Sequence, residues 1–171
     1  KDQPFFVHME HFAVHDPIQG RRDLVAKYQK KLDAMPRSEG PNHIVEGNPD
    51  DPEFTEEELE AIVANKSHAL CKEKRAWWVS QKQENFEYAA LVEAMDESLA
   101  RIRAKLKALG LEENTIIVFT SDNGGLAATR EISLDKIINS TKQLNQRFAT
   151  SNLPLRGGKG WNYEGGVRVP L

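Results

Sequence analysis

One segment constrains the fold of this 171-residue chain more than any other: a long helical pattern followed by a buried strand pattern. From Phe86 to Leu109, apolar residues recur at steps of three and four, which predicts a helix with one apolar face. Gly110 supplies the left-handed residue that commonly ends a helix. Residues 115–120, Thr-Ile-Ile-Val-Phe-Thr, have almost no polar alternation, as expected for a strand covered on both faces of a parallel sheet. The segment therefore predicts an α/β unit.

The residues directly after this strand form the first candidate site. Asp122 and Asn123 place a carboxylate and a carboxamide at the carboxyl edge of the predicted strand, where open α/β sheets bind ligands. Two adjacent hard oxygen donors suit Ca²⁺ or Mg²⁺. Asp-Asn-Gly-Gly is also a common turn sequence, so these residues alone leave a plain turn without a ligand open.

A glycine-rich segment further along the chain is the second candidate. Residues 155–160, Leu-Arg-Gly-Gly-Lys-Gly, set two cations among three glycines, so the backbone can approach an anion while Lys159 adds a point charge. The segment is not a Walker A loop, because Leu153 stands where that motif needs glycine and Gly160 where it needs Ser or Thr. A flexible loop with solvated charges is the alternative.

Three histidines near the start of the chain are the third candidate set. The spacing of His8, His11 and His15 is superficially that of a zinc site. Residues 5–9 are apolar and aromatic, which predicts a buried strand, and its alternation would turn positions 8 and 11 to opposite faces. We therefore interpret His15, beyond the strand, as a single polar group at the sheet edge. A hydrogen-bonded structural histidine is the alternative.

The other segments have weaker patterns. Leucine and tyrosine at steps of four predict a helix over 21–32, and Thr55 with Glu58 forms a capping-box signature before a predicted helix over 56–70. The Trp77-Trp78 pair is compatible with a further helical stretch. Proline and glycine favour a surface loop over 36–53, and residues 126–154 are predicted to be a loop or insertion between the two site motifs.

Composition excludes several classes of protein. The formal net charge of −3 does not favour a nucleic-acid binder, and no apolar run is long enough to span a bilayer. Cys71 is the only cysteine, so an internal disulfide is impossible. The chain opens at Lys1 without a signal peptide and stops at Leu171 without a capping segment. We expect one partial domain over 1–171, cut at both ends.

Taken together, the motifs resemble the sulfatase family of the alkaline-phosphatase-like superfamily. Residues 4–6 with 13–19 resemble the family's strand and loop with a substrate histidine, and residues 88–96 resemble the helix before the metal strand. Residues 115–125 resemble that strand with its Asp-Asn pair, and residues 155–160 with 163–170 resemble the second sulfatase signature. The segments follow one another in the order of the family. They span nearly the whole chain. This ordered set favours the ligand-binding interpretations of Asp122, Asn123 and Lys159 over the plain turn and the solvated loop.

The resemblance implies both a fold and an activity. The fold would be a three-layer α/β/α domain with a mostly parallel central sheet, of which this chain supplies some strands and helices. Asp122 and Asn123 would ligate a divalent cation, usually calcium with magnesium as the alternative. His15 and Lys159 would bind the sulfate ester and act in catalysis. The parent protein would hydrolyse sulfate esters with a formylglycine nucleophile and would be periplasmic or secreted.

This sequence also departs from the family pattern. The family's paired aspartates, its C-x-P-x-R nucleophile and its Lys-x-His segment have no counterpart here. Cys71 and Arg75 share the nucleophile's spacing, but Glu73 replaces the proline and the segment continues a predicted helix, which favours an inert cysteine. Two oxygen ligands are too few for calcium. We therefore expect the isolated chain to be inactive, to bind calcium weakly, and to need the remainder of the parent domain.

Two other functions and the identity of the substrate remain open at this stage. A phosphatase or phosphodiesterase of the same superfamily would use similar metal-binding and basic residues, and a non-catalytic anion-binding domain would have lost the nucleophile. The locally basic segment 126–154 is compatible with a sulfated saccharide, but a solvated surface explains the same charges, which come from Arg130, Lys136, Lys142 and Arg147.

Overall fold

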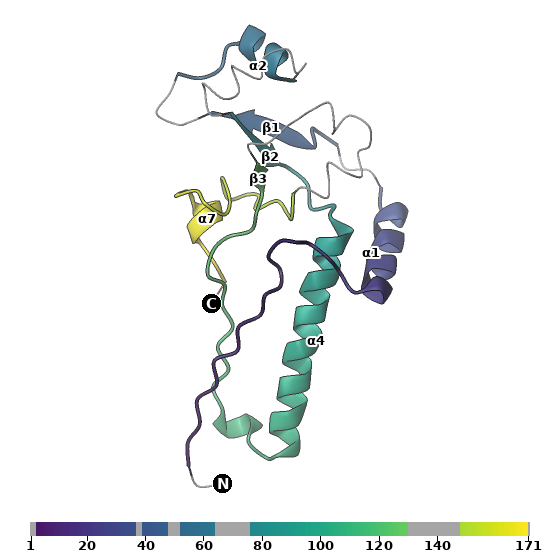
Figure 1. Cartoon of the computed structure of the whole chain (residues 1–171), viewed down its shortest axis with the longest axis vertical. Coiled ribbons are helices and arrows are strands. Elements are labelled where there is room, and N and C mark those ends of the chain that lie inside the picture. Colours follow the sequence, from purple (N-terminus) through teal and green to yellow (C-terminus); the bar gives the residue numbers. More distant parts are fainter. Residues whose placement is uncertain (1–2, 37–38, 48–51, 64–75, 130–147, 171) are drawn as a thin grey trace. The chain divides into compact units, whose positions relative to one another are not determined.

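The computed structural model describes residues 3–36, 39–47, 52–63, 76–129 and 148–170 (Figure 1). The chain divides into two compact units, and each is described by itself. Unit 1 consists of Lys1–Asp33 and Phe86–Thr115, and unit 2 consists of Ala34–Asn85 and Ile116–Leu171. In the described part of the chain, no helix is both long and apolar enough to cross a membrane.

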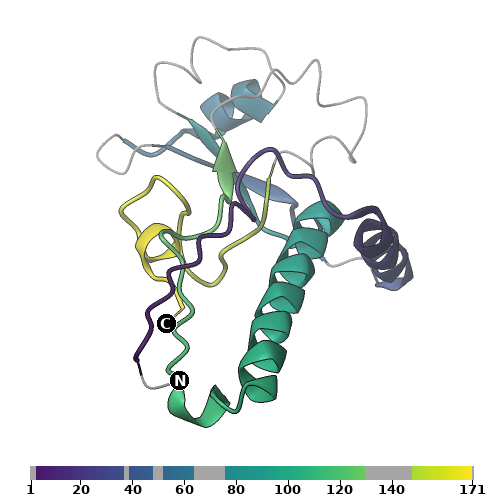
Figure 2. The same ribbon diagram turned by 60° about the horizontal axis from the view of Figure 1, so that its bottom comes forward.

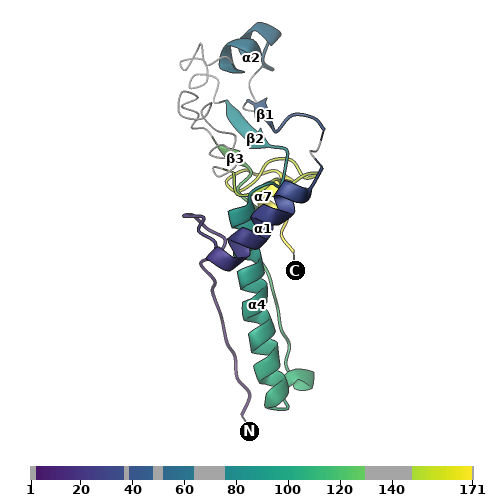
Figure 3. The same cartoon turned by 90° about the vertical axis from the view of Figure 1, so that its right-hand side faces the viewer.

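Unit 1 contains two helices that the sequence predicted. These are α1 (Arg22–Ala34) and the longer α4 (Phe86–Ala108), which is followed by the short 3₁₀ helix η1 (Glu112–Asn114) (Figure 3). Gly110 has a φ of 66°, the Leu111 N–H donates to the Leu106 carbonyl at 2.9 Å, and the Gly110 N–H donates to the Lys107 carbonyl at 3.0 Å. This pair of bonds is a Schellman motif, so the predicted glycine cap is confirmed.

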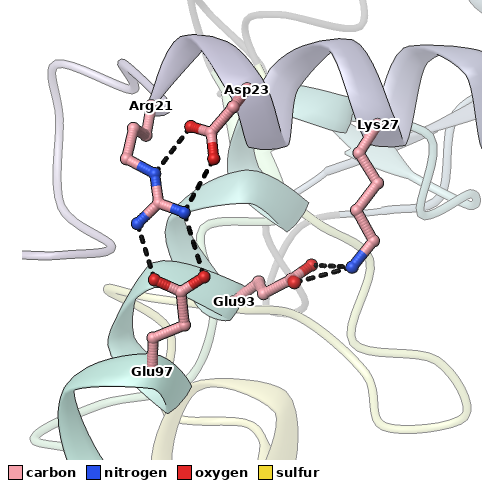
Figure 4. A network of polar contacts seen from close by, with 5 residues as sticks. All are labelled: Arg21, Asp23, Lys27, Glu93 and Glu97. Atoms are coloured by element: carbon pink, nitrogen blue, oxygen red, sulfur yellow. Dashed lines mark hydrogen bonds and ion pairs between the residues drawn. The ribbon is translucent and has the colours of Figure 1, made fainter. Parts of the chain in front are cut away.

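Ion pairs join α1 and the residue before it to α4 on exposed faces (Figure 4). The Arg21 guanidinium donates to both Glu97 carboxylate oxygens, at 2.6 and 2.9 Å, and also to Asp23. The Lys27 ammonium donates to both oxygens of Glu93, at 2.6 and 2.7 Å. The hydrogen bonds from Arg21 lower the pKa of Asp23 and of Glu97, and the bond from Lys27 lowers the pKa of Glu93.

Unit 2 contains a three-stranded antiparallel sheet in the order β1-β2-β3 (Figure 2). The strands are β1 (His43–Glu46), β2 (Trp77–Ser80) and β3 (Ala128–Thr129). In this register His43 faces Ser80 and Val79 faces Ala128. The buried apolar side chains of this unit include those of Ile62, Val79, Ala127 and Phe148.

Among its described residues, unit 2 also contains two short helices. Helix α2 (Glu56–Val63) begins with the predicted capping box: the Thr55 N–H donates to the Glu58 carboxylate at 3.0 Å, and the Glu58 N–H donates to the Thr55 hydroxyl at 3.2 Å. The remainder of the helix predicted over 56–70 lies outside the described residues. A single short turn, α7 (Glu164–Val167), follows the glycine-rich segment.

Three predictions about unit 2 are corrected. Trp77 and Trp78 lie in β2 rather than in a helix, because their backbones pair with β1 and β3. The segment 36–53, predicted to be a surface loop, contains β1, which pairs with β2 along its whole length. The segment 126–154 contains β3. All four of its basic residues lie outside the described residues, so the prediction of a sulfated saccharide as substrate is untested.

The two predicted buried strands are also corrected. Residues 5–9 and 115–120 are not hydrogen-bonded as strands, and their apolar side chains are exposed, up to 90% for Phe6 and 92% for Ile116. A central strand needs neighbouring strands for its backbone groups and covering elements for both faces, and no described residues provide them. The sheet in the described residues is antiparallel, so the mostly parallel central sheet stays a prediction.

Candidate active site

Asp122 and Asn123 lie in a loop of unit 2 that directly follows residues 115–120. The Ser121 hydroxyl donates to the Asn123 carbonyl at 2.8 Å and closes the turn. The Asn123 amide nitrogen donates to the Gly124 carbonyl at 2.9 Å, which leaves its Oδ1 available as an oxygen ligand. The Asp122 side chain is exposed and has no hydrogen-bond or ionic partner among the described residues.

Lys159 lies on a second loop, and its backbone binds the first one. The Lys159 N–H donates to the Gly125 carbonyl at 3.0 Å, and the Trp161 N–H donates to the Gly158 carbonyl at 3.0 Å to form the next turn. The Lys159 ammonium has no ionic partner among the described residues. The structure therefore brings the segment of Asp122 and Asn123 against the segment of Lys159.

Glycines allow these backbones to approach so closely. A Cβ atom on Gly124 would collide with the carbonyl of Gly165, and one on Gly165 would meet the Arg156 carbonyl at 2.5 Å. The Gly124 N–H donates to the Gly166 carbonyl at 2.9 Å, and the Gly165 N–H donates to the Arg156 carbonyl at 2.8 Å. Three segments, at 124–125, 157–158 and 165–166, thus pack backbone against backbone.

Arg156, the second cation of the glycine-rich loop, is already engaged. Its Nε donates to the Glu46 carboxylate at 3.1 Å, and its guanidinium lies 4.3 Å from the centre of the Tyr163 ring. The Glu46 side chain is only 16% exposed, so β1 supplies a half-buried counter-charge to this loop. Lys159 rather than Arg156 is therefore the loop cation available to an anion.

His15 belongs to unit 1 and is exposed. Its Nδ1 lies 3.1 Å from the Asp16 carbonyl, so that nitrogen carries the proton and Nε2 remains an acceptor in the neutral ring. Its backbone N–H donates to the Phe12 carbonyl at 3.0 Å. Because each unit is described by itself, a joint site of His15 with Lys159 stays a prediction.

The other early histidines have local partners. His11 Nε2 lies 3.0 Å from the Ser98 hydroxyl, and His8 Nδ1 lies 3.7 Å from the Glu10 carboxylate. Among the described residues there is no cluster of three or more His, Cys, Asp and Glu side chains that could hold a metal ion. Cys71 and Arg75 lie outside the described residues. The prediction that this cysteine is inert is therefore untested.

A titratable group that the sequence did not single out is His43 of β1. Burial, with a smaller contribution from the charge of Lys82, lowers the pKa of His43 to about 4. Its ring packs 4.5 Å from that of Phe148 at the edge of a small polar pocket. Packing against an aromatic ring and the lowered pKa describe a neutral structural histidine.

Comparison with known proteins decides the family. The sulfatase family model matches residues 1–171, the entire chain. The chain belongs to the sulfatase family. Membership carries an alkaline-phosphatase-like α/β fold and sulfuric ester hydrolysis at the level of the family. The family prediction made from the ordered motifs is confirmed.

Individual relatives agree with this assignment. A sulfatase of Formosa agariphila is 30% identical over 178 residues, covering 99% of this chain but 20% of the relative. The steryl-sulfatase of Mus musculus is 42% identical over 83 residues, covering 48% of this chain and 12% of the relative, and arylsulfatase J of the same species is 35% identical over 82 residues, covering 48% and 10%. The chain thus spans about a fifth or less of these three relatives.

Sequence reasoning missed two residues that connect the loops of this candidate site. Asn152 donates to carbonyls of both loops, and Glu46 binds Arg156 from a strand that was predicted to be a loop. A single polar residue in an irregular segment carries no periodic signal. Only the three-dimensional pairing of distant segments identifies them.

Proposed function

We propose that the protein containing this chain hydrolyses sulfate esters, with Lys159 binding the sulfate group and Asp122 with Asn123 holding a divalent cation. One observation carries the proposal: the Lys159 N–H donates to the Gly125 carbonyl, which joins the loop of a candidate anion-binding lysine to the loop of a candidate metal-binding pair. Family membership supplies the reaction class.

The chemistry of the donors fits a hard cation. The Asp122 carboxylate is exposed and the Asn123 Oδ1 is not used by its own side-chain bond, so both offer oxygen ligands of the kind that calcium prefers. When bound, calcium would supply positive charge that offsets the charge on the sulfuryl oxygens. The remaining ligands and the formylglycine nucleophile would come from outside this sequence.

The chain's own residues would then bind and orient the ester. The Lys159 ammonium, free of an ionic partner among the described residues, would hold a sulfuryl oxygen. His15 would donate a hydrogen bond or a proton to the leaving oxygen, a role that needs the ring to be protonated at Nε2 as well as at Nδ1. We expect the 171-residue chain alone to show no turnover, because its sequence contains no C-x-P-x-R nucleophile.

The test compares esters and cations on the full-length wild-type protein. We expect it to hydrolyse 4-nitrophenyl sulfate faster than 4-nitrophenyl phosphate, to lose activity when a chelator removes the divalent cation, and to regain it with calcium. Faster turnover of the phosphate would show a phosphatase or phosphodiesterase of the superfamily instead. Turnover of neither ester, with sulfate binding retained, would show an anion-binding domain.

A further inference from the structure

The side chain of Asn152 is bonded to both loops of the candidate active site. Its Nδ2 donates to the Gly125 carbonyl at 2.8 Å and to the Gly157 carbonyl at 3.0 Å. Gly125 follows the Asp122-Asn123 pair, and Gly157 lies two residues before Lys159. One carboxamide therefore spans the two segments that the proposed function uses.

The chemistry of its neighbours sets the orientation of this carboxamide. Both partners are carbonyl oxygens, which only accept, so the amide NH₂ group and not Oδ1 must face them. The Gly125 carbonyl accepts a second hydrogen bond, from the Lys159 N–H at 3.0 Å. Asn152 and the Lys159 backbone thus share one acceptor.

Asn152 also follows a segment that is itself held in place. The Gln83 side chain donates to the Ser151 carbonyl at 2.8 Å, and the Asn85 side chain donates to the Phe148 carbonyl at 3.0 Å. Ser151 and Phe148 are each only 3% exposed. The bonds of Asn152 therefore start from a buried segment anchored to the residues after β2.

We propose that Asn152 is a positioning residue that fixes the separation between the Asp122-Asn123 pair and Lys159, so that a divalent cation and an anionic ester are bound as a unit. This inference rests on the proposed function. Asn152 acts through the carbonyls of Gly125 and Gly157 and does not itself contact the substrate. Its loss should weaken cation binding and ester binding together.

Two Asn152 variants of the full-length protein and a matched control test this role. Asn152→Asp keeps the shape of the side chain but replaces its two donors by an acceptor, and Asn152→Ala removes the donors without adding charge. Asn162→Asp is the control. Asn162 is exposed and lies three residues after Lys159, so its replacement adds the same negative charge close to that lysine.

The Asn152 substitutions should weaken the binding of ester and cation more than they slow turnover. In Asn152→Asp we expect the KM for 4-nitrophenyl sulfate and the calcium concentration for half-maximal activity each to rise about tenfold, the effect of losing one or two net hydrogen bonds. The kcat should change less, because the lost interactions serve ground-state binding as much as the transition state. The control should change both values by less than about twofold. Unchanged values in both Asn152 variants would overturn the proposal.

Hydrogen exchange at the Lys159 amide gives a readout independent of activity. We expect this amide to be protected in the wild type and to lose at least about tenfold of its protection in Asn152→Ala, because the shared acceptor is no longer fixed. A wild type that hydrolyses no sulfate ester would remove the proposed function. Even then, lower protection of the Lys159 amide in Asn152→Ala than in the wild type would support the role of Asn152, and equal protection in the two proteins would overturn it.

Discussion

Different kinds of interaction stabilise each of the two units. In unit 1, exposed ion pairs of Arg21 and Lys27 with glutamates of α4 join its two long helices. In unit 2, the site loops meet through backbone hydrogen bonds at close glycine contacts, such as that between Gly124 and Gly165. Side-chain ion pairs respond to salt and pH, whereas backbone contacts respond to added volume. The loops of the candidate active site should therefore be sensitive to small increases in side-chain volume at these glycines.

The largest expected effect comes from adding one methyl group to a glycine contact. Gly165→Ala places a Cβ against the carbonyls of Gly157 and Arg156, so we expect it to destabilise unit 2 by about 3 kcal/mol. Chemical unfolding followed by tryptophan fluorescence measures this, because the chain's three tryptophans, Trp77, Trp78 and Trp161, all belong to unit 2.

Gly160→Ala is the matched control for that variant. Gly160 lies in the same segment with a φ of 86°, and a Cβ there would have nothing within 4 Å. Only the left-handed backbone then opposes the substitution, at a cost of about 1 to 2 kcal/mol. Equal losses in the two variants would show that backbone conformation, and not close packing, determines the stability of these loops.

A medium effect is expected at the ion pair between Arg156 of the glycine-rich segment and Glu46 of β1. Arg156→Ala removes both the bond to Glu46 and the stacking on Tyr163, and should cost about 1 kcal/mol in the same fluorescence measurement. Arg156→Lys keeps the charge and should recover part of the loss. Arg168→Ala, which breaks an exposed pair with Glu164, is the control and should cost less. The reverse order would contradict the role given to Glu46.

The smallest effect is expected in unit 1. Because Arg21 and Lys27 lower the pKa of Asp23, Glu93 and Glu97, their pairing stabilises the fold above the unfolded pKa of about 4, and this contribution is lost as the pH falls through the lower folded values. Helical circular dichroism should show a modest loss of stability at low pH, and a similar loss in 1 M salt at neutral pH.

Glu97→Gln should reduce this dependence on pH and salt, because it removes the carboxylate that Arg21 binds with two hydrogen bonds. Glu113→Gln, at an exposed position of η1, serves as the control and should behave like the wild type. Stability of the helices that is independent of salt in all three proteins would remove the distinction between the two units.

The parts that sequence reasoning predicted correctly are those governed by local rules. The period of α4, its glycine cap and the Thr55-Glu58 capping box each depend on residues within one or two turns. Strand pairing is different, because β1 and β2 recognise each other across more than thirty residues. The short apolar run at Trp77 fits a helix and a strand equally well until its partner is known.

The same distinction applies to the candidate site. The segments of Asp122, Asn123 and Lys159 were predicted from adjacent motif residues, and the structure brings these segments together. Asn152 was not predicted, because its role depends on two carbonyls contributed by other segments. The apolar run 115–120 predicted burial that the described residues do not provide, since hydrophobicity records the need for neighbours and not their presence.

The most direct test of this account is the turnover of 4-nitrophenyl sulfate by the full-length protein carrying Lys159→Met, measured beside Lys107→Met on the exposed end of α4. If Lys159 holds the sulfate group, its loss should reduce kcat/KM by about 100-fold or more, the usual effect of removing a charge that stabilises a transition state. Lys107→Met should match the wild type. Equal activity of the two variants would contradict the account.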